Sequence, residues 1–212
     1  NEPVIQYANR IIDLMATESG SLSSAIAGFF NSAELLSTQP NSGTFRKEFL
    51  NSAEVVASRF NDLSLQIDRV AQDSESEFRA AVNELNALSD QLVVVNRQLN
   101  RKTSVDEQPP GLLDQRDAIL RDIASLTKVG VTELKSGQVL VNFGGAGRGF
   151  EFVTTTESKK VAIFSSQEKS AVDLRLVLDP YGARRPLPNN PGGQLGGYMA
   201  FNTEVLRSAR VG

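Results

Sequence analysis

The residues best placed to do chemistry are two carboxylates, Asp114 and Asp117, on either side of Arg116. Acids three residues apart share a helix face and could serve as a general acid and base. The alternative is structural, since acids near the start of a helix stabilise its positive end, with Arg116 or Arg121 as ion partners. We favour the structural interpretation. Because Arg116 is a charge on an otherwise apolar stripe, we expect it to pair with a carboxylate across a corner of the chain.

Two further groups of residues invite a chemical interpretation. Gly144–Gly149 resembles a phosphate loop in composition, but it lacks the Gly-Lys-Ser/Thr sequence and precedes an expected strand, so we expect a β connection. The acids that could be taken for metal ligands lack the spacing of a calcium loop, and we expect them on the solvated surface. These acids are Asp106, Glu107, Asp173 and Asp179. We therefore predict no metal, no cofactor and no catalytic residue.

Composition supports the same view. The chain has no Cys, so it has no thiolate metal site, and no His, which is the commonest general base and metal ligand. Its net charge of −3 does not favour a nucleic-acid partner. No apolar run approaches the roughly 20 residues that span a bilayer, so we expect no membrane contact.

Hydrophobic periodicity predicts two long helices before the candidate acids. The first occupies the first 36 residues, with a break expected at Ser19–Ser21, and ends in the turn cluster Ser37–Gly43. The second runs from Phe45 to Leu99 without Pro or Gly, which would make it about 85 Å long at 1.5 Å per residue. So long a stripe is typical of a coiled-coil-like seam.

The pattern changes after Pro109–Gly111. A third helix is expected over Leu112–Thr127, antiparallel to the long one because the connection is short. Alternating residues then predict strands, and a proline-rich linker leads to a returning helix. The expected segments are a hairpin at Val129–Phe143, strands at Phe150–Thr155, Val161–Ser165 and Val172–Leu178, the linker Arg185–Gly193 and the helix Tyr198–Ala209.

These segments predict an α+β fold, an elongated antiparallel helical bundle of long coiled-coil-like helices with a small inserted β-rich domain. The expected domains are a helical rod at 1–128, a β domain at 129–187, and a linker with a returning helix at 188–212.

Several segments in this order resemble the flagellar hook-associated protein 1 family. Leu112-Leu113-Asp114-Gln115-Arg116-Asp117, after a long helix, is the most specific of them. Gly193-Gln194-Leu195-Gly196-Gly197 resembles the Gly-x-Leu-Gly-Gly segment by which the family's chain returns to the rod. The others are Phe29–Leu36, Arg46–Phe60 and Asn83–Asn100. The residues expected to have a structural role are Leu112, Leu113, Asp114, Gln115, Arg116, Asp117, Gly193, Leu195, Gly196 and Gly197.

The resemblance implies a structural subunit of the extracellular bacterial flagellum, exported without a cleaved signal peptide and needed for filament assembly. Its implied partners are like subunits in a ring, the hook protein and the adjacent junction protein. It also implies a middle fragment without the family's terminal helices, through which an export chaperone would bind. Part of the apolar stripe from Phe45 to Val70 is then expected to be exposed.

Two alternatives remain open at this point. One is another axial flagellar subunit, such as the neighbouring junction protein or a flagellin-like protein. The other is a carbohydrate-binding or hydrolytic module on the β insert, which would need two acids in one pocket about 5–10 Å apart.

Overall fold

The computed structural model describes residues 2–144, 150–168, 171–188 and 190–206. The chain divides into two compact units. One consists of Gln6–Asp73, and the other of Asn1–Ile5 together with Ser74–Gly212. Helix α2 (Gly43–Leu99) contributes residues to both units.

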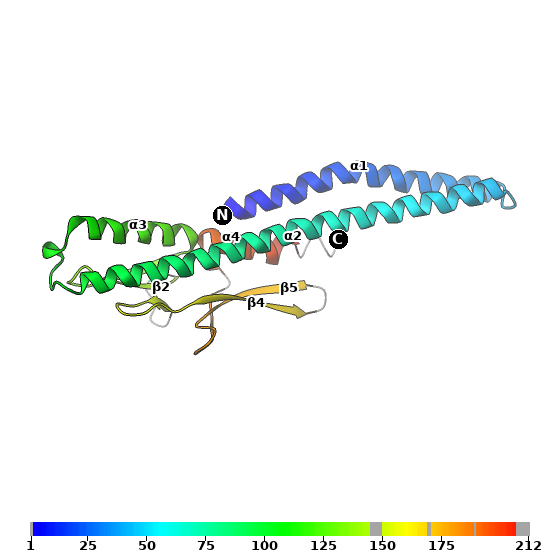
Figure 1. Cartoon of the computed structure of the whole chain (residues 1–212). Helices are drawn as coiled ribbons and strands as arrows, with labels where there is room; N and C mark the ends of the chain where they lie inside the picture. The colour runs from blue at the N-terminus through cyan, green and yellow to red at the C-terminus, as the bar shows by residue number, and fades with distance from the viewer. Residues whose placement is uncertain (1, 145–149, 169–170, 189, 207–212) are drawn as a thin grey trace. The chain divides into compact units, whose positions relative to one another are not determined.

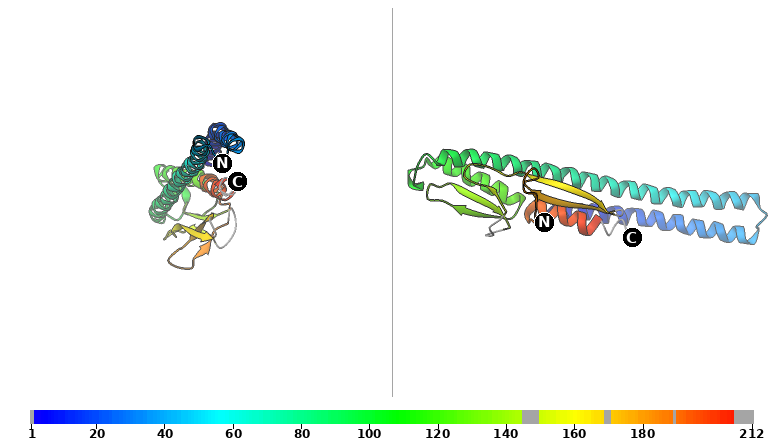
Figure 2. Two further views of the ribbon diagram at one scale, coloured as in Figure 1. Left: turned by 90° about the vertical axis from the view of Figure 1, so that its right-hand side faces the viewer. Right: turned by 90° about the horizontal axis from the view of Figure 1, so that it is seen from below.

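The unit Gln6–Asp73 is an antiparallel hairpin of two helices (Figure 2). Helix α1 (Glu2–Thr38) supplies one arm and the first part of α2 supplies the other. Near the turn the rings of Phe29 and Phe49 lie 5.0 Å apart between centroids. At the far end Arg10 Nη2 lies 2.9 Å from Asp73 Oδ2. The pairing of early residues of α1 with late residues of α2 is what an antiparallel hairpin requires.

The break expected at Ser19–Ser21 is wrong, because α1 is continuous from Glu2 to Thr38. A glycine inside a helix costs only about 1 kcal/mol relative to alanine, which the surrounding turns can outweigh. Ser19 Oγ donates to the Ala16 carbonyl one turn earlier at 3.0 Å. Serine hydroxyls that bond to a preceding turn are compatible with a continuous helix.

The apolar stripe in the first half of α2 is unevenly covered, as predicted. Phe60 is 52% exposed, whereas Ile67 and Val70 near the end of this half are buried. The remaining members, Phe45, Phe49, Val56 and Leu63, are half-buried. The two arms alone therefore leave apolar surface accessible on this unit.

The second unit contains the other helices. Helix α3 (Pro110–Leu126) runs back alongside the C-terminal part of α2, as the short connection predicted (Figure 1). Between them lies the short 3₁₀ helix η1 (Val105–Glu107). The returning helix begins earlier than predicted, since α4 spans Gly193–Ala200 and continues as a π-helix, η2, at Phe201–Val205. Residues 207–209 of the predicted helix lie outside the described residues.

Two three-stranded antiparallel sheets complete this unit. The first has the order β1-β2-β3 and contains the predicted hairpin, with Val129 opposite Phe143. The second has the order β4-β5-β6. Its last strand, β6, occupies the first two residues of the predicted linker, so these residues form an edge strand instead. The bounds are β1 Val129–Glu133, β2 Val139–Phe143, β3 Glu151–Val153, β4 Val161–Glu168, β5 Ala171–Leu178 and β6 Arg185–Pro186.

The core of this unit is formed by one face of each sheet and one stripe of each helix. Alternate residues of the central strands are buried, as expected for a sheet with one covered face. Phe143 and Phe152 of neighbouring strands lie 4.4 Å apart between ring centroids. The fully buried large side chains are Phe78, Leu85, Leu92 and Leu99 of α2, Ile123 and Leu126 of α3, Phe152, Leu174, Leu176 and Leu178 of the strands, and Leu195 and Phe201 of the return.

Candidate functional site

The corner between α2 and α3 is closed by a buried glutamine. Gln108 Nε2 donates to the Leu99 carbonyl at 2.6 Å and to the Ser136 carbonyl at 2.7 Å. Helix α3 then begins at Pro110. Proline suits this position because the N–H of the first helical residue has no partner within the helix, so its absence costs no hydrogen bond. One side chain thus joins the end of the long helix to the turn between β1 and β2.

Arg116 carries the predicted charge pairing across this corner. Its Nη1 lies 2.6 Å from Glu133 Oε1 of β1 and donates to the Gly137 carbonyl at 2.7 Å. Its Nε donates to Asp117 Oδ1 at 2.8 Å. The residue is only 8% exposed, so its cation is held by three partners inside the fold. The prediction that Arg116 pairs with a carboxylate is confirmed.

The surroundings of Arg116 keep it charged. Burial by itself lowers the pKa of the guanidinium, but its hydrogen bonds to Glu133 and Asp117 raise it, and the net pKa lies above the ordinary value. A fixed cation bonded to half-exposed carboxylates has no proton to exchange near neutral pH. The geometry therefore supports a structural role rather than acid–base chemistry.

The helix-start explanation for Asp114 and Asp117 is wrong. Because α3 begins at Pro110, its first turn contains no acid, and both residues lie beyond it. The expected ion partner is present, since Asp117 pairs with Arg116, whereas Asp114 is exposed, as is Gln115. The sequence was misleading here because the third helix was expected to begin at Leu112, whereas Pro110 is the first helical residue.

Leu112 and Leu113 of the same segment are half-buried, and Leu113 lies beside the hairpin turn. Gly137 in that turn has φ of +81°, and a Cβ added to it would lie 3.2 Å from Leu113 Cδ2. A left-handed conformation favours glycine for steric reasons. The beginning of α3 therefore packs on a turn that has little room for a larger residue.

The glycine-rich return meets the opposite end of α3. Gly193 has φ of +59°, and an added Cβ would lie 2.6 Å from both the carbonyl carbon and oxygen of Leu126. Thr127 Oγ1 and Lys128 N both donate to the Pro191 carbonyl at 2.8 Å. The chain can come this close only because Gly193 has no side chain.

The rest of the return is buried as well. Leu195 is fully buried, and Gly196 and Gly197 are buried beside it. An added Cβ at Gly196 would lie 2.8 Å from Asn190 Oδ1, and one at Gly197 would lie 3.2 Å from Pro3 Cδ. Helix α4 therefore packs closely on two sides, against the Asn190 side chain and against Pro3. The two segments singled out by the sequence lie near the two ends of α3, and α3 contacts α4, so the helices before and after the strands pack together as predicted.

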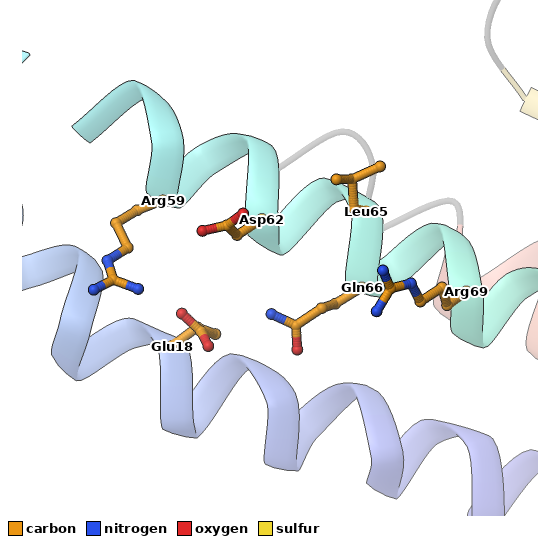
Figure 3. Close-up of a pocket in the computed structure, with 6 residues that line it drawn as sticks. All are labelled: Glu18, Arg59, Asp62, Leu65, Gln66 and Arg69. Carbon is orange, nitrogen blue, oxygen red and sulfur yellow. The ribbon is translucent and has the colours of Figure 1, made fainter. Parts of the chain in front are cut away.

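A shallow depression lies on the other unit, between the two arms of the hairpin (Figure 3). Glu18 points into it from α1, and the remaining lining residues come from α2. They are Arg59, Asp62, Leu65, Gln66 and Arg69. Its charged groups balance, with two acids and two arginines. None of the sequence-predicted site residues lines it.

The other chemical candidates do not converge. Asp106 and Glu107 lie on η1, and the Asp179 carboxylate accepts from the Ala183 N–H at 3.2 Å within its own turn. Residues 145–149 of the glycine-rich segment and the side chain of Asp173 lie outside the described residues. Within the part of the chain that the structure describes, no group of three or more potential ligand residues could hold a metal ion. In that same part, no helix is both long and apolar enough to cross a membrane.

Sequence reasoning missed the polar contacts of α2 with the strands. Asp90, in the later part of the helix, accepts hydrogen bonds from Ser158 Oγ and Lys160 Nζ, each at 2.5 Å. Asn86 and Asn96 bond to strand backbone. The only signal was a set of polar residues near the apolar stripe, and the partners are at least 43 residues away in sequence.

The contact of Asp90 predicts a pH dependence. Hydrogen bonds from Lys160 and Ser158 lower the pKa of Asp90, so this contact stabilises the fold above the carboxylate's ordinary pKa and is lost as the pH falls toward the lower value in the fold. Because the pair is largely exposed, Asp90→Asn is expected to cost only about 0.5 kcal/mol near pH 7. Urea unfolding should show this difference shrinking below about pH 4, where the carboxylate of the wild type takes up its proton. If Asp90→Asn lowered the stability equally near pH 7 and below about pH 4, the stabilising role of the Asp90 contact would be contradicted.

Comparison with known proteins gives a consistent result. The family model of the flagellar hook-associated protein FlgK helical domain matches residues 8–211. Flagellar hook-associated protein 1 of Bacillus subtilis is 31% identical over 124 residues, covering 58% of this chain and 24% of that protein. The Salmonella typhimurium protein of the same name is 23% identical over 213 residues, covering 97% of this chain and 37% of that protein.

A solved structure shares the fold. The flagellar hook junction protein FlgK from Burkholderia pseudomallei superimposes with a TM-score of 0.76 at 22% identity, over 94% of this chain and 36% of that one. The predicted α+β class, with long helices and small antiparallel sheets, is thereby confirmed. The chain spans only about a quarter to a little over a third of the length of the relatives it matches.

Proposed function

Because the chain belongs to the family of the flagellar hook-associated protein FlgK helical domain, we propose that it is part of a structural subunit of the bacterial flagellum. In this proposal the subunit lies at the junction between hook and filament and is needed for filament assembly. The observation that carries it is the family match over residues 8–211. The names of the matched relatives, hook-associated protein 1 and hook junction protein, agree with this location.

The role of the two sequence segments in this proposal is to hold the helices around the strands. Arg116 and its neighbours would secure the start of α3, and Gly193–Gly197 would let α4 return against its end. The buried position of Arg116 and the close approach of Gly193 support this role. Catalysis has no part in the proposal.

Three segments of the chain would have different structural roles in the subunit. Residues 1–128 would form the helical rod of the subunit, 129–187 an inserted β domain, and 188–212 the linker and returning helix. The accessible apolar residues of the hairpin, including Phe60, suit contacts within an assembly.

The partners follow from the proposed location. They would be like subunits in a ring, the hook protein and the adjacent junction protein, with a chaperone assisting export through a terminal region of the full protein. The subunit would act outside the cell, reached by flagellar export without a cleaved signal peptide. No nucleic acid or membrane is required.

Deletion of the encoding gene in the source bacterium tests this proposal. The expected result is a cell that builds hooks without filaments and does not swim, because the filament would lose its attachment. Restoring the gene should restore filaments. Normal filaments in the deletion strain would contradict the proposed function, and loss of the hooks as well would indicate a different position along the axis.

A further inference from the structure

The later part of α2 presents a polar docking face to the strands, formed by Asn86, Asp90, Asn96 and Arg97. Asn86, Asp90 and Arg97 are four and seven residues apart and so lie along one side of the helix. Every member bonds to a residue at least 43 positions away in sequence. This face is distinct from the Arg116 corner and from the glycine-rich return.

Asn96 forms a paired contact with the first residue of β2. Its Nδ2 donates to the Val139 carbonyl at 2.8 Å, and its Oδ1 accepts from the Val139 N–H at 2.9 Å. The same Nδ2 donates to the Thr154 carbonyl at 3.0 Å, and the Asn96 carbonyl accepts from Gln138 Nε2 at 3.0 Å. Asn96 is fully buried, so the hydrogen-bonding capacity of its amide is met inside the fold.

Asn86 repeats this arrangement on the first residue of β4. Its Nδ2 donates to the Val161 carbonyl at 2.9 Å, and its Oδ1 accepts from the Val161 N–H at 2.8 Å. Two residues that exchange both bonds in this way are what an antiparallel ladder contains. Each asparagine therefore takes the place of a strand neighbour, one for each sheet.

The segment between the two contacts follows the helix in the opposite direction. Arg97 Nη2 donates to the Thr156 carbonyl at 2.6 Å. Further along, Ser158 and Lys160 bond to Asp90. From Arg97 through Asp90 to Asn86, the order of contacts along α2 is thus the reverse of the order of their partners, Thr156 to Val161, along the chain.

We infer that Asn86 and Asn96 are two separate anchors that fix the position and the strand register of the two sheets on α2. Apolar packing alone tolerates a shift of strands along a helix, because it has no directional requirement. A shifted strand would leave two backbone groups without partners, together with the buried amide of Asn96 or the half-buried amide of Asn86, which is costly. The inference does not depend on the proposed function, since it concerns how this chain holds its own strands.

Hydrogen exchange of the 212-residue chain tests whether the anchors are separate. Asn96→Ala is expected to speed exchange of the Val139 amide about 10- to 100-fold, since a buried hydrogen bond is lost, with little change at Val161. Asn86→Ala should do the reverse. Asn83→Ala is the matched control, because Asn83 is an exposed asparagine on the same helix and should change neither.

A titratable variant gives a test of the paired bonds themselves. In Asn96→Asp the carboxylate can accept from the Val139 N–H but cannot donate to the two carbonyls, whereas the protonated acid can donate to one. The partners of the Asn96 amide and carbonyl are Val139, Thr154 and Gln138, none of which titrates. Burial among carbonyls should raise the folded-state pKa of this acid, so the variant's stability relative to wild type should improve as the pH falls.

The urea midpoint of Asn96→Asp should therefore be lower than that of wild type at about pH 7. Near pH 4, around the ordinary Asp pKa, this difference should fall to half or less. Asn96→Leu should show no such recovery, and titration of Asp90 is common to all three chains. If Asn96→Ala does not fold, Asn86→Ala and the recovery of Asn96→Asp on acidification decide the matter. Three results would each overturn the inference. The first is that each alanine variant speeds exchange of the Val139 and Val161 amides equally. The second is exchange of these amides no faster than in Asn83→Ala, and the third is no recovery of Asn96→Asp stability on acidification.

Discussion

Gly193→Ala is expected to lower the free energy of unfolding of the unit that contains α3 and α4 by about 3 kcal/mol, from backbone strain and overpacking together. The added Cβ would lie 2.6 Å from the carbonyl carbon and oxygen of Leu126 and 2.7 Å from Thr127 N, all of which are backbone atoms. Backbone cannot rotate away as a flexible side chain can. The φ of +59° adds strain that an L-residue rarely tolerates.

Gly111→Ala is the matched control for this variant. Gly111 also lies in the second unit, at the beginning of α3, and a Cβ there would meet nothing within 4 Å. Its replacement should change stability by no more than about 1 kcal/mol, in the stabilising direction, because alanine favours the helix. Chemical denaturation followed by circular dichroism measures both. Similar effects for the two variants would contradict the close approach at Gly193.

Arg116→Ala is expected to cost about 2 kcal/mol, because it leaves the buried Gly137 carbonyl without its donor. The two carboxylates are about half exposed and can regain water, which keeps the loss below that of a fully buried ion pair. Arg116→Lys should cost roughly half as much, since one ammonium group cannot reproduce the forked contacts to Glu133, Asp117 and Gly137.

The control for Arg116 is Arg121→Ala on the same helix. Arg121 is exposed, and its removal should change the free energy of unfolding by less than about 0.5 kcal/mol. Denaturation midpoints of the three variants give the comparison. An Arg116→Ala variant as stable as Arg121→Ala would show that the buried cation does not stabilise the corner.

The long helices and the first hairpin could be predicted because local patterns determine them. Residues from Phe45 to Leu99 repeat every three or four positions without a glycine or proline, and α2 follows that pattern closely. The hairpin predicted at Val129–Phe143 is likewise confirmed by the pairing of β1 with β2. Patterns were less reliable for glycine and proline, which can lie inside a helix or at its start as well as in a turn. The segment Ser19–Ser21 was expected to break α1, and α3 was expected to begin only after Pro110.

The site was predictable only in part, because its contacts connect distant segments. The charge of Arg116 on an apolar stripe predicted a carboxylate partner, but its bond to Glu133 depends on how β1 folds back beside α3. Gly193 is important because it lies against the backbone of Leu126, which is 67 positions earlier in the sequence. Asn86 and Asn96 gave no comparable signal, since an asparagine on a helix is usually solvated.

The most direct test of the account is where the protein lies on the flagellum of the source bacterium. Antibodies raised against the 212-residue chain and labelled with gold can be located on isolated hook–filament assemblies by electron microscopy. A structural subunit of the junction predicts label confined to a band between the hook and the filament. Label along the filament, along the hook, or only on the cell body would contradict the account.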